Sequence, residues 1–299
     1  MFLLTSSRCR RGATRGRRQP MATEDLPVLV DRVDGGVAVC TLNRPSTLNA
    51  MSARLVEHLH ETLDELGRDR SCRAVVLTGA GRGFCSGHDL GELRDGASGG
   101  RRLSNPVAVG MEHQQEFARL VTAMRALPQP IIAAVNGVAV GGGLALALGA
   151  DTRLASTSAK FGAAFVRVGL SGCDMGVSYL LPRIVGATAA FEMMLSGRMV
   201  SAEEAADRGL VLRVVSDGEV VDAAVKVARS FAANSPFGVR MTKEVMWSNL
   251  EAPSLANAIA LEDRTQSLCF GTREQREAVA AVIERRPAVF DTTSSGKVS

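Results

Sequence analysis

The chain has 299 residues, of which 46% are hydrophobic, and a mean hydropathy of +0.09, so it can bury one large core or a core plus a small appendage. Its net charge of +4 comes from six arginines in residues 1–20, and the rest of the chain is slightly acidic with one tryptophan and one tyrosine. This composition excludes a basic, aromatic-rich face that could bind nucleic acid. No apolar run approaches the roughly 18 residues that span a bilayer, so we expect a soluble protein.

The first twenty residues are rich in Arg, Ser and Thr and contain no acid. This composition is typical of an organellar transit peptide, which would direct the protein to the mitochondrial matrix. The alternative, which we favour, is an upstream start codon with Met21 opening the protein. Only four lysines accompany 31 arginines, which suggests a GC-rich bacterial genome and a cytoplasmic protein. We expect residues 1–22 and 291–299 to be disordered.

Cysteine and histidine usage gives no sign of a metal site. The six cysteines are scattered without a C-x-x-C pair and indicate reduced cytosolic thiols. His58 and His60 are two residues apart on a predicted helix, so they point to different faces of it. We therefore expect no bound metal.

Strands and helices alternate as far as residue 216. Ser52 can cap a helix that runs to about Arg68, and Ser201 with Glu204 forms a capping box at the start of a short helix. The alternation predicts an α/β core with right-handed crossovers. The predicted strands are Val37–Asn43, Arg73–Thr78, Ile131–Val135, Thr152–Ala155 and Leu210–Val215, with Lys160–Val168 continuing the sheet. Further helices are predicted over residues 107–126, 144–150 and 176–184, and a polar, mobile loop over Arg94–Ser104.

Beyond residue 216 the pattern is helical, with segments at 220–233, 238–249, 254–269 and 273–285. We predict a core over residues 23–216 and a helical region over residues 217–290. A helical segment this small does not bury its apolar faces alone, so it should pack on the core or on a neighbouring subunit.

Two glycine-rich loops, Gly79–Gly91 and Gly137–Gly143, each follow a predicted buried strand. In a parallel sheet both loops lie at the carboxyl edge, where ligands bind in α/β folds. Two such loops can aim two backbone N–H groups at one oxygen and so stabilise an enolate or a tetrahedral intermediate. The alternative for the second loop is that its glycines only let a helix pack closely on the sheet.

Five segments, in order and in register from about Val28 to Phe290, resemble the crotonase, or enoyl-CoA hydratase/isomerase, superfamily. They are L-N-R-P-S-T-L-N-A from Leu42, G-R-G-F-C-S-G-H-D-L from Gly81, P-I-I-A-A-V-N-G-V-A-V-G-G-G from Pro130, L-P-R-I-V-G from Leu181 and the S-A-E-E-A segment within Gly197–Val211. The resemblance implies a spiral ββα core and a C-terminal helical trimerisation region, assembled as a homotrimer or a hexamer made of two trimers. It also implies an acyl-CoA thioester as the ligand and no resident cofactor, since CoA is part of the substrate.

The resemblance assigns an oxyanion hole to the main-chain N–H groups of His88 and Gly142. Because these groups act through the backbone, the His88 side chain is either a bystander or a participant. The resemblance further implies contacts to CoA, and one of them comes from a neighbouring subunit. The implied contacts are Arg44 to Ala50, Asp89, Leu90, Gly91 and, from the neighbouring subunit, Arg285.

The chain departs from the family pattern at the two glutamates with which hydratases hold water and protonate carbon. Ala145 and Phe165 occupy those positions, and neither side chain can transfer a proton. Asp174 resembles the catalytic aspartate of dienoyl-CoA isomerases, although its segment has one extra residue, and it could instead cap the following helix. Glu112 and Glu116 are weaker candidates that fit a solvated helix face.

These features predict an enzyme of the hydratase/isomerase family, a lyase or isomerase of fatty acid metabolism. It would act on an acyl-CoA thioester through an enolate, with His88, Gly142 and Asp174 as catalytic residues. Isomerase-type proton transfer is favoured over hydration. The alternative is a catalytically silent homologue that binds acyl-CoA.

Overall fold

Two sheets form the centre of the molecule, which is represented by a computed structural model that describes residues 26–95 and 106–290. The predictions for residues 1–22 and 291–299, and for most of the loop Arg94–Ser104, lie outside the described residues. The six-stranded sheet has the order β1 (Val28–Val33), β2 (Val37–Leu42), β3 (Ala74–Gly79), β5 (Ile131–Val135), β7 (Thr152–Ser156) and β10 (Arg213–Val215). The four-stranded sheet has the order β4 (Gly83–Cys85), β6 (Val138–Val140), β8 (Lys160–Gly162) and β9 (Val200–Ser201).

The chain winds between the two sheets as a spiral. A strand in the first sheet is followed by a short strand in the second, so β3 leads to β4, β5 to β6 and β7 to β8, and helices then return the chain to the first sheet. Pairing from β2 to β10 is parallel, and only β1 pairs antiparallel to its neighbour in that sheet. This repetition confirms the spiral ββα core.

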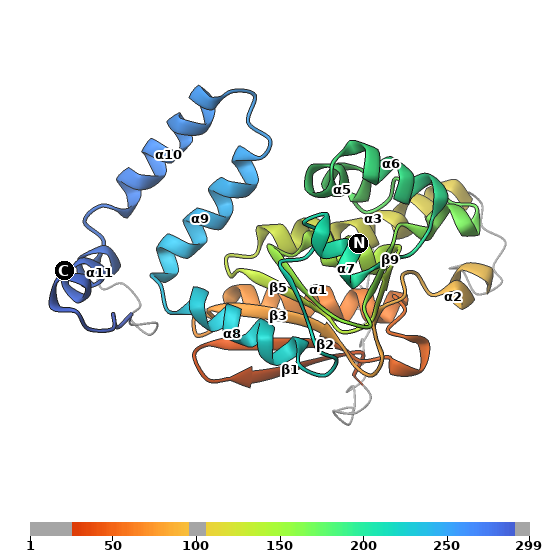
Figure 1. The fold of residues 1–299 in the computed structure, drawn as a ribbon, viewed down its shortest axis with the longest axis horizontal. Helices are drawn as coiled ribbons and strands as arrows, with labels where there is room; N and C mark the ends of the chain where they lie inside the picture. The colour runs from red at the N-terminus through yellow and green to blue at the C-terminus, as the bar shows by residue number, and fades with distance from the viewer. Residues whose placement is uncertain (1–25, 96–105, 291–299) are drawn as a thin grey trace, which may run out of the picture.

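Helices cover both faces of the six-stranded sheet (Figure 1). Side chains alternate between the faces: in β3, Val75 and Leu77 join the larger core, whereas Ala74 and Val76 pack under α8. The larger core contains the inward faces of α1 (Ala53–Arg68), α3 (Pro106–Ala126), α4 (Gly142–Gly149) and α5 (Val177–Val185). The remaining helices are α2 (Leu90–Asp95), α6 (Ala187–Ser196), α7 (Ala202–Asp207), α8 (Val220–Ala232), α9 (Pro236–Asn249), α10 (Leu255–Cys269) and α11 (Arg273–Glu284), and the 3₁₀ turns are η2 (Pro45–Thr47) and η3 (Ala164–Val168).

Several elements differ from the sequence prediction. Residues 160–168 do not extend the first sheet, because β8 pairs with β6 in the second sheet and residues 164–168 form η3. The sequence prediction missed β1, β4, β6, β9, α2 and α6, and β10 is shorter than the predicted strand Leu210–Val215. The capping box is only half formed. The Ser201 hydroxyl accepts from the Glu204 N–H at 3.2 Å, but the Glu204 carboxylate binds Arg198 and Arg208 instead of returning to the cap.

The last three helices, α9–α11, form an arm that extends away from the sheets (Figure 1). The sequence predicted that the helical region packs on the core or on a neighbouring subunit, and α8 does lie against the sheet. The arm is fixed to the core through the second half of α9. Lys243 Nζ donates to Met124 O (3.0 Å) and Gln129 O (2.9 Å) and lies 3.0 Å from Asp151 Oδ2. Trp247 Nε1 donates to the other oxygen of Asp151 at 2.7 Å.

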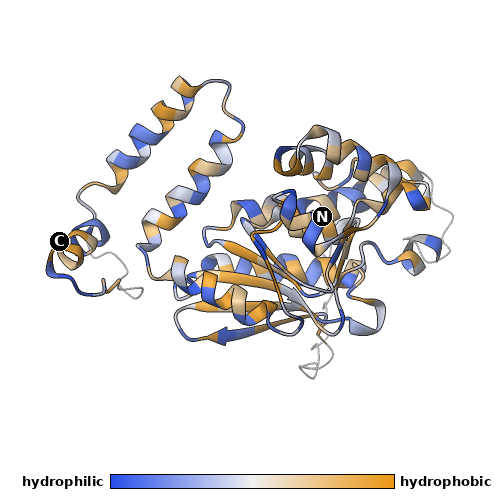
Figure 2. Ribbon diagram, viewed as in Figure 1, coloured by the Kyte–Doolittle hydropathy of each residue, from blue (hydrophilic) through white to orange (hydrophobic). Residues whose placement is uncertain are grey.

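Apolar side chains are exposed along the arm, where orange segments occur on helices that face no sheet (Figure 2). On α10 and α11 the exposed apolar residues are Leu255, Ile259, Leu268, Val279, Val282 and Ile283. None of the helices in the described part of the chain combines the length and the apolar character needed to cross a membrane.

Candidate active site

The two glycine-rich loops leave neighbouring strands at the same edge of the sheet. β3 and β5 are parallel and hydrogen-bonded to each other, so the loops that follow Gly79 and Val135 start side by side. Each loop then contributes a strand, β4 or β6, to the second sheet, and these two strands are also paired. The topology therefore brings together the two loops that the sequence had singled out.

Two asparagine side chains fasten these loops. Asn136 Nδ2 donates to the carbonyls of Gly79 (2.8 Å) and Gly81 (2.9 Å), and its Oδ1 accepts from the Gly79 N–H at 3.2 Å. Asn49, which is fully buried, donates to the Gly83 carbonyl at 2.7 Å and accepts from the Arg44 N–H at 2.8 Å. In the sequence, Asn136 was only the residue that ends a strand, and Asn49 was only part of a motif. The available signals were that Asn136 precedes a glycine and that Asn49 follows a turn, positions at which an asparagine side chain often hydrogen-bonds the loop backbone.

The backbone around His88 is held by Met51. The Met51 N–H donates to Gly87 O at 2.7 Å, and the Asp89 N–H donates to Met51 O at 3.1 Å. This pairing leaves the N–H of His88 on the side away from Met51. Gly87 has φ +94°, and a Cβ there would lie only 2.8 Å from Val140 O, so the close approach of the two loops requires glycine.

Gly142 is the first residue of α4, where backbone N–H groups have no partner within the helix. Within residues 26–95 and 106–290, neither the Gly142 N–H nor the His88 N–H donates a hydrogen bond. A Cβ on Gly87 would lie 3.4 Å from the Gly142 nitrogen, so the peptide before His88 directly faces Gly142. Two unbonded donors on loops that approach each other this closely suit an oxygen that gains negative charge during a reaction.

Both residues line one cavity of about 270 Å³. Most of its wall is apolar, and His88 and Arg167 provide its ionisable side chains among the described residues. The lining residues are Ser86, Gly87, His88, Leu90, Val140, Gly141, Gly142, Ala164, Phe165, Arg167, Val168, Leu170 and Met199. An apolar cavity with a few polar groups at one end is typical of a small-molecule site.

The two residues at the hydratase glutamate positions differ in their access to this cavity. Phe165 lines it, and its ring lies 3.5 Å from the position of a Cβ on Gly141. Ala145 is fully buried in α4 and is not part of the cavity wall. No carboxylate is therefore presented from either position.

The His88 ring lies against α3. It stacks on Phe117 with a centroid distance of 4.4 Å and an interplanar angle of 12°, and His113 contacts the same Phe117 ring at 4.4 Å. Burial lowers the pKa of His88 below its ordinary value, the carboxylate of Asp174 acts to raise it, and His113 acts to lower it further. His88 is therefore mainly neutral at pH 7, when an imidazole can accept a proton.

Asp174 is half-buried in the loop before α5 and does not line the cavity. Its Oδ1 accepts a hydrogen bond from Gln114 Nε2 on α3. The N-cap of α5 is Gly176, which has no side-chain cap, so the carboxylate of Asp174 does not serve as the predicted helix cap. Glu112 and Glu116 are exposed on α3, and Glu116 pairs with Arg119.

The residues expected to contact CoA form a cluster beside the first loop, with one exception. Arg44 donates to Ala50 O at 2.6 Å and pairs with Asp89 at 2.9 Å, and Asp89 accepts from the Gly91 N–H at 3.0 Å. Partial burial opposes the charge on Asp89, but the hydrogen bond and charge of Arg44 prevail and lower the pKa of this carboxyl. Leu90 follows with its side chain 58% exposed at the rim of the cavity.

The exception is Arg285, which ends α11 at the tip of the arm. In Figure 1, α11 and α2, the helix that begins at Leu90, lie at opposite ends of the molecule. A single chain thus does not bring Arg285 to the cavity, and a role there requires a second copy, as the resemblance implies.

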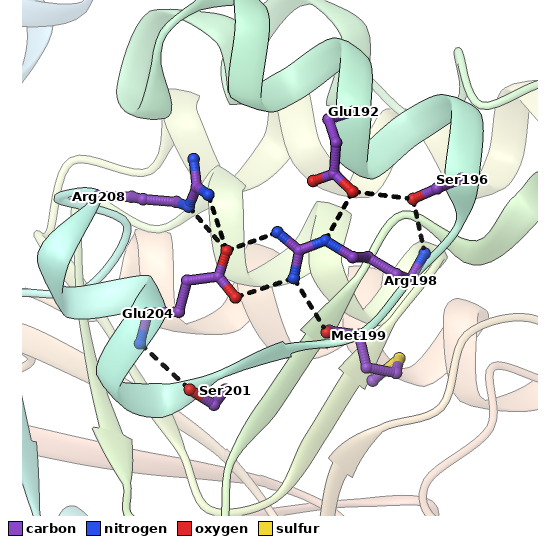
Figure 3. Close-up of polar contacts among 7 residues, drawn as sticks. All are labelled: Glu192, Ser196, Arg198, Met199, Ser201, Glu204 and Arg208. Carbon is purple, nitrogen blue, oxygen red and sulfur yellow. Dashed lines mark hydrogen bonds and ion pairs between the residues drawn. The ribbon is translucent and has the colours of Figure 1, made fainter.

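A group of charged residues supports the segment that carries Met199 to the cavity. Arg198 pairs with Glu192 at 2.6 Å and with Glu204 at 2.5 Å, and Arg208 reaches the same Glu204 oxygen at 2.8 Å (Figure 3). The guanidinium also contacts the Met199 carbonyl at 3.4 Å. This group fixes the backbone next to the cavity without entering it.

Comparison with known proteins decides the family. The model of the enoyl-CoA hydratase/isomerase family matches residues 32–293. The chain belongs to this family. A protein of Mycobacterium leprae described as a probable enoyl-CoA hydratase is 44% identical over 88% of this chain and 89% of its own length. The 1,2-epoxyphenylacetyl-CoA isomerase of Escherichia coli is 37% identical over 89% of this chain and 98% of its own length.

Solved structures agree with this assignment to the enoyl-CoA hydratase/isomerase family. The enoyl-CoA hydratase of Bacillus anthracis superposes with a TM-score of 0.82 at 30% identity and covers 89% of this chain and 99% of its own. An enoyl-CoA hydratase of Mycobacterium smegmatis gives a TM-score of 0.79 at 33% identity, covering 88% and 98%. The family and its crotonase fold, predicted from five sequence segments, are confirmed.

Proposed function

We propose that this family member moves a proton on an acyl-CoA thioester by way of an enolate, and that it favours isomerisation over hydration. The His88 and Gly142 N–H groups would hold the thioester oxygen as negative charge develops on it. The apolar wall from Val140 to Met199 would hold the acyl chain, and the Arg44–Asp89 cluster would lie beside CoA. CoA enters as part of the substrate, and no resident cofactor takes part.

The observation that carries this proposal is a pair of unbonded N–H donors in a cavity that receives no carboxylate from positions 145 and 165. Hydration needs one group to hold water and another to protonate carbon, and each such group contributes about 10²- to 10⁴-fold. Proton movement between two carbons needs a single group, and Asp174 is the candidate carboxylate whose charge acts on the His88 ring. The similarity to an isomerase that acts on an acyl-CoA supports the same choice.

The test is proton exchange in heavy water. Purified protein is incubated with butyryl-CoA, phenylacetyl-CoA and a 3-enoyl-CoA, and deuterium uptake and double-bond position are followed by mass spectrometry. We expect exchange and isomerisation without net hydration, and a loss of about 10²-fold or more in Asp174→Asn. Glu112→Gln, which removes an exposed carboxylate from α3, is the control and should keep the full rate.

The competing function, a silent acyl-CoA binder, predicts a different result in the same experiment. The thioesters would bind in calorimetry, but deuterium uptake would stay at the uncatalysed rate. Exchange that depends on Asp174 excludes this alternative.

We further propose that the enzyme assembles as a trimer or as two trimers through the arm. The exposed apolar residues of α10 and α11 support a partner there, since single domains rarely leave such a surface uncovered. Analytical ultracentrifugation should show the oligomer, and Leu255→Ser with Val282→Ser should dissociate it. A monomeric wild-type protein would contradict this assembly. The cytoplasmic location stays a prediction from the sequence.

A further inference from the structure

The His88 side chain lies where a group that exchanges protons with the acyl chain should be. Among the described residues of the cavity wall, His88 alone has a side chain that both accepts and donates a proton near neutral pH. Its Nδ1 lies 3.6 Å from the position of a Cβ on Gly142, so the ring is next to the second N–H donor. The oxyanion hole uses only the backbone of His88, which leaves the ring free for another role.

Helix α3 brings the ring together with Asp174. Phe117 holds the ring by stacking, and Gln114, one turn earlier, holds the Asp174 carboxylate by its hydrogen bond. Phe117 is 1% exposed, so this support is part of the core. Asp174 itself does not line the cavity, so a proton on the acyl chain has a shorter path to the ring than to the carboxylate.

We propose that the imidazole of His88 is the proton-transfer group of this enzyme, with Asp174 as the positioning residue that acts through it. The proposal rests on the enolate function proposed above. It names the group that transfers the proton in a site that lacks the two hydratase glutamates. It makes His88 bifunctional: the main-chain N–H stabilises the enolate oxygen and the side chain exchanges the proton.

The reaction on a 3-enoyl-CoA balances without a further reactant. The neutral ring takes a proton from the α-carbon, and the electron pair of the broken C–H bond becomes a dienolate with its charge on the thioester oxygen. The imidazolium then returns the proton to the γ-carbon, and the double bond moves from C3–C4 to C2–C3. The ring ends neutral and ready for the next substrate.

The charged and titratable groups around the ring come from three elements. Asp174 lies in the loop before α5, His113 is on α3, and Arg167 of η3 is on the cavity wall. Asp174 favours the imidazolium and His113 opposes it. Removing one or the other should therefore move the ionisation of His88 in opposite directions, which a purely structural role of these residues would not produce.

The experiment compares His88→Phe and His88→Asn with wild type in the heavy-water assay on phenylacetyl-CoA and a 3-enoyl-CoA. Both variants keep the main-chain N–H, and Phe keeps an aromatic ring for stacking on Phe117. We expect exchange to fall about 10²- to 10⁴-fold, while the thioester Kd from calorimetry changes less than about threefold. Wild-type exchange should fall in acid as the ring is protonated. This acid limb should shift to lower pH in Asp174→Asn and to higher pH in His113→Asn.

Each failure has its own meaning. If wild type exchanges no proton on any thioester, the proposed function is wrong and this inference falls with it. If wild type exchanges but both His88 variants match it, only the role of the ring is overturned. The role of the ring is also overturned if the His88 variants are slow but the wild-type rate shows no acid limb. It is overturned as well if Asp174→Asn and His113→Asn shift the acid limb in the same direction, because the ring would then only support the structure.

Discussion

Gly87 and Gly142 approach each other so closely that a Cβ on Gly87 would lie 3.4 Å from the Gly142 nitrogen. This contact brings together backbone from two loops that are about 55 residues apart in the sequence. The proposed oxyanion hole would therefore be a property of the tertiary structure, since neither loop alone presents two donors to one oxygen.

The first prediction isolates the Gly142 N–H. Gly142→Pro removes it, and proline is well tolerated at the first position of a helix. Gly142→Ala is the matched control, because it keeps the N–H and adds the same Cβ, 2.8 Å from the movable Met51 sulfur. We expect the proline variant to exchange protons about 10²- to 10³-fold more slowly than the alanine variant. Equal rates in the two variants would exclude a role for this N–H.

The second prediction concerns the size of the acyl site. Phe165→Ala enlarges the cavity and should raise kcat/KM for phenylacetyl-CoA relative to butyryl-CoA by about tenfold. Because Phe165 is 4% exposed, the variant should also lose about 3 kcal/mol of unfolding free energy. Val168→Ala, at a 52% exposed residue of the same wall, should lose less than about 0.5 kcal/mol. An unchanged preference in Phe165→Ala would show that the ring does not limit the site.

The third prediction tests the anchor of the arm. Lys243→Met leaves the Asp151 carboxylate without its buried partner, and breaking such a pair costs about 3 kcal/mol. Lys226→Met removes an exposed lysine from α8 and should change stability by less than about 0.5 kcal/mol. Urea denaturation measures both. Similar stabilities for the two variants would mean that water replaces Lys243 at no cost.

The fourth prediction concerns stability in acid. Hydrogen bonds from Arg198 lower the pKa of Glu204 from 4.5 to about 2 in the folded protein. The pairing therefore stabilises the fold fully at pH values above the pKa of the unfolded state, and this stabilisation is lost as pH falls through the pKa of the folded state. Between about pH 5 and pH 2, wild type should lose more unfolding free energy than Glu204→Gln. Glu203→Gln, at the exposed neighbouring residue, should retain the wild-type slope. Parallel curves for wild type and Glu204→Gln would contradict the shift.

Sequence patterns predicted the elements whose signals are local. Ile131–Val135 has the predicted bounds because a continuous apolar run is followed by Asn-Gly, and α1 begins where Ser52 caps it. The three-residue strands β4 and β6 were missed because they lie inside glycine-rich loops and form through pairing within the second sheet, β4 with β6 and β6 with β8. β1 was missed because its middle residues are exposed at an edge and carry no apolar alternation.

The candidate site, like the fold, was predictable from the sequence only where its signals are local. Gly142 and His88 follow from two loops at one sheet edge and from the family segments. Gln114 and Phe117 could not be found in this way, because the sequence does not say which face of α3 meets the loop before α5. Asp174 was considered as a possible cap because it lies just before Gly176 and an apolar helix, but the direction of its carboxylate is set by the tertiary contact with Gln114.

Asp151 ties together segments that are distant in the sequence. One of its oxygens accepts from the Ile131 N–H at 2.7 Å and meets Lys243, and the other binds Trp247. The first residue of β5 and two turns of α9 are thus locked to one carboxylate, and α9 cannot swing without breaking several bonds at once. The arm is consequently preorganised. In the proposed assembly, a second copy of the chain would meet a helix, α9, whose direction is already fixed, and association would lose less conformational entropy than with a hinged arm.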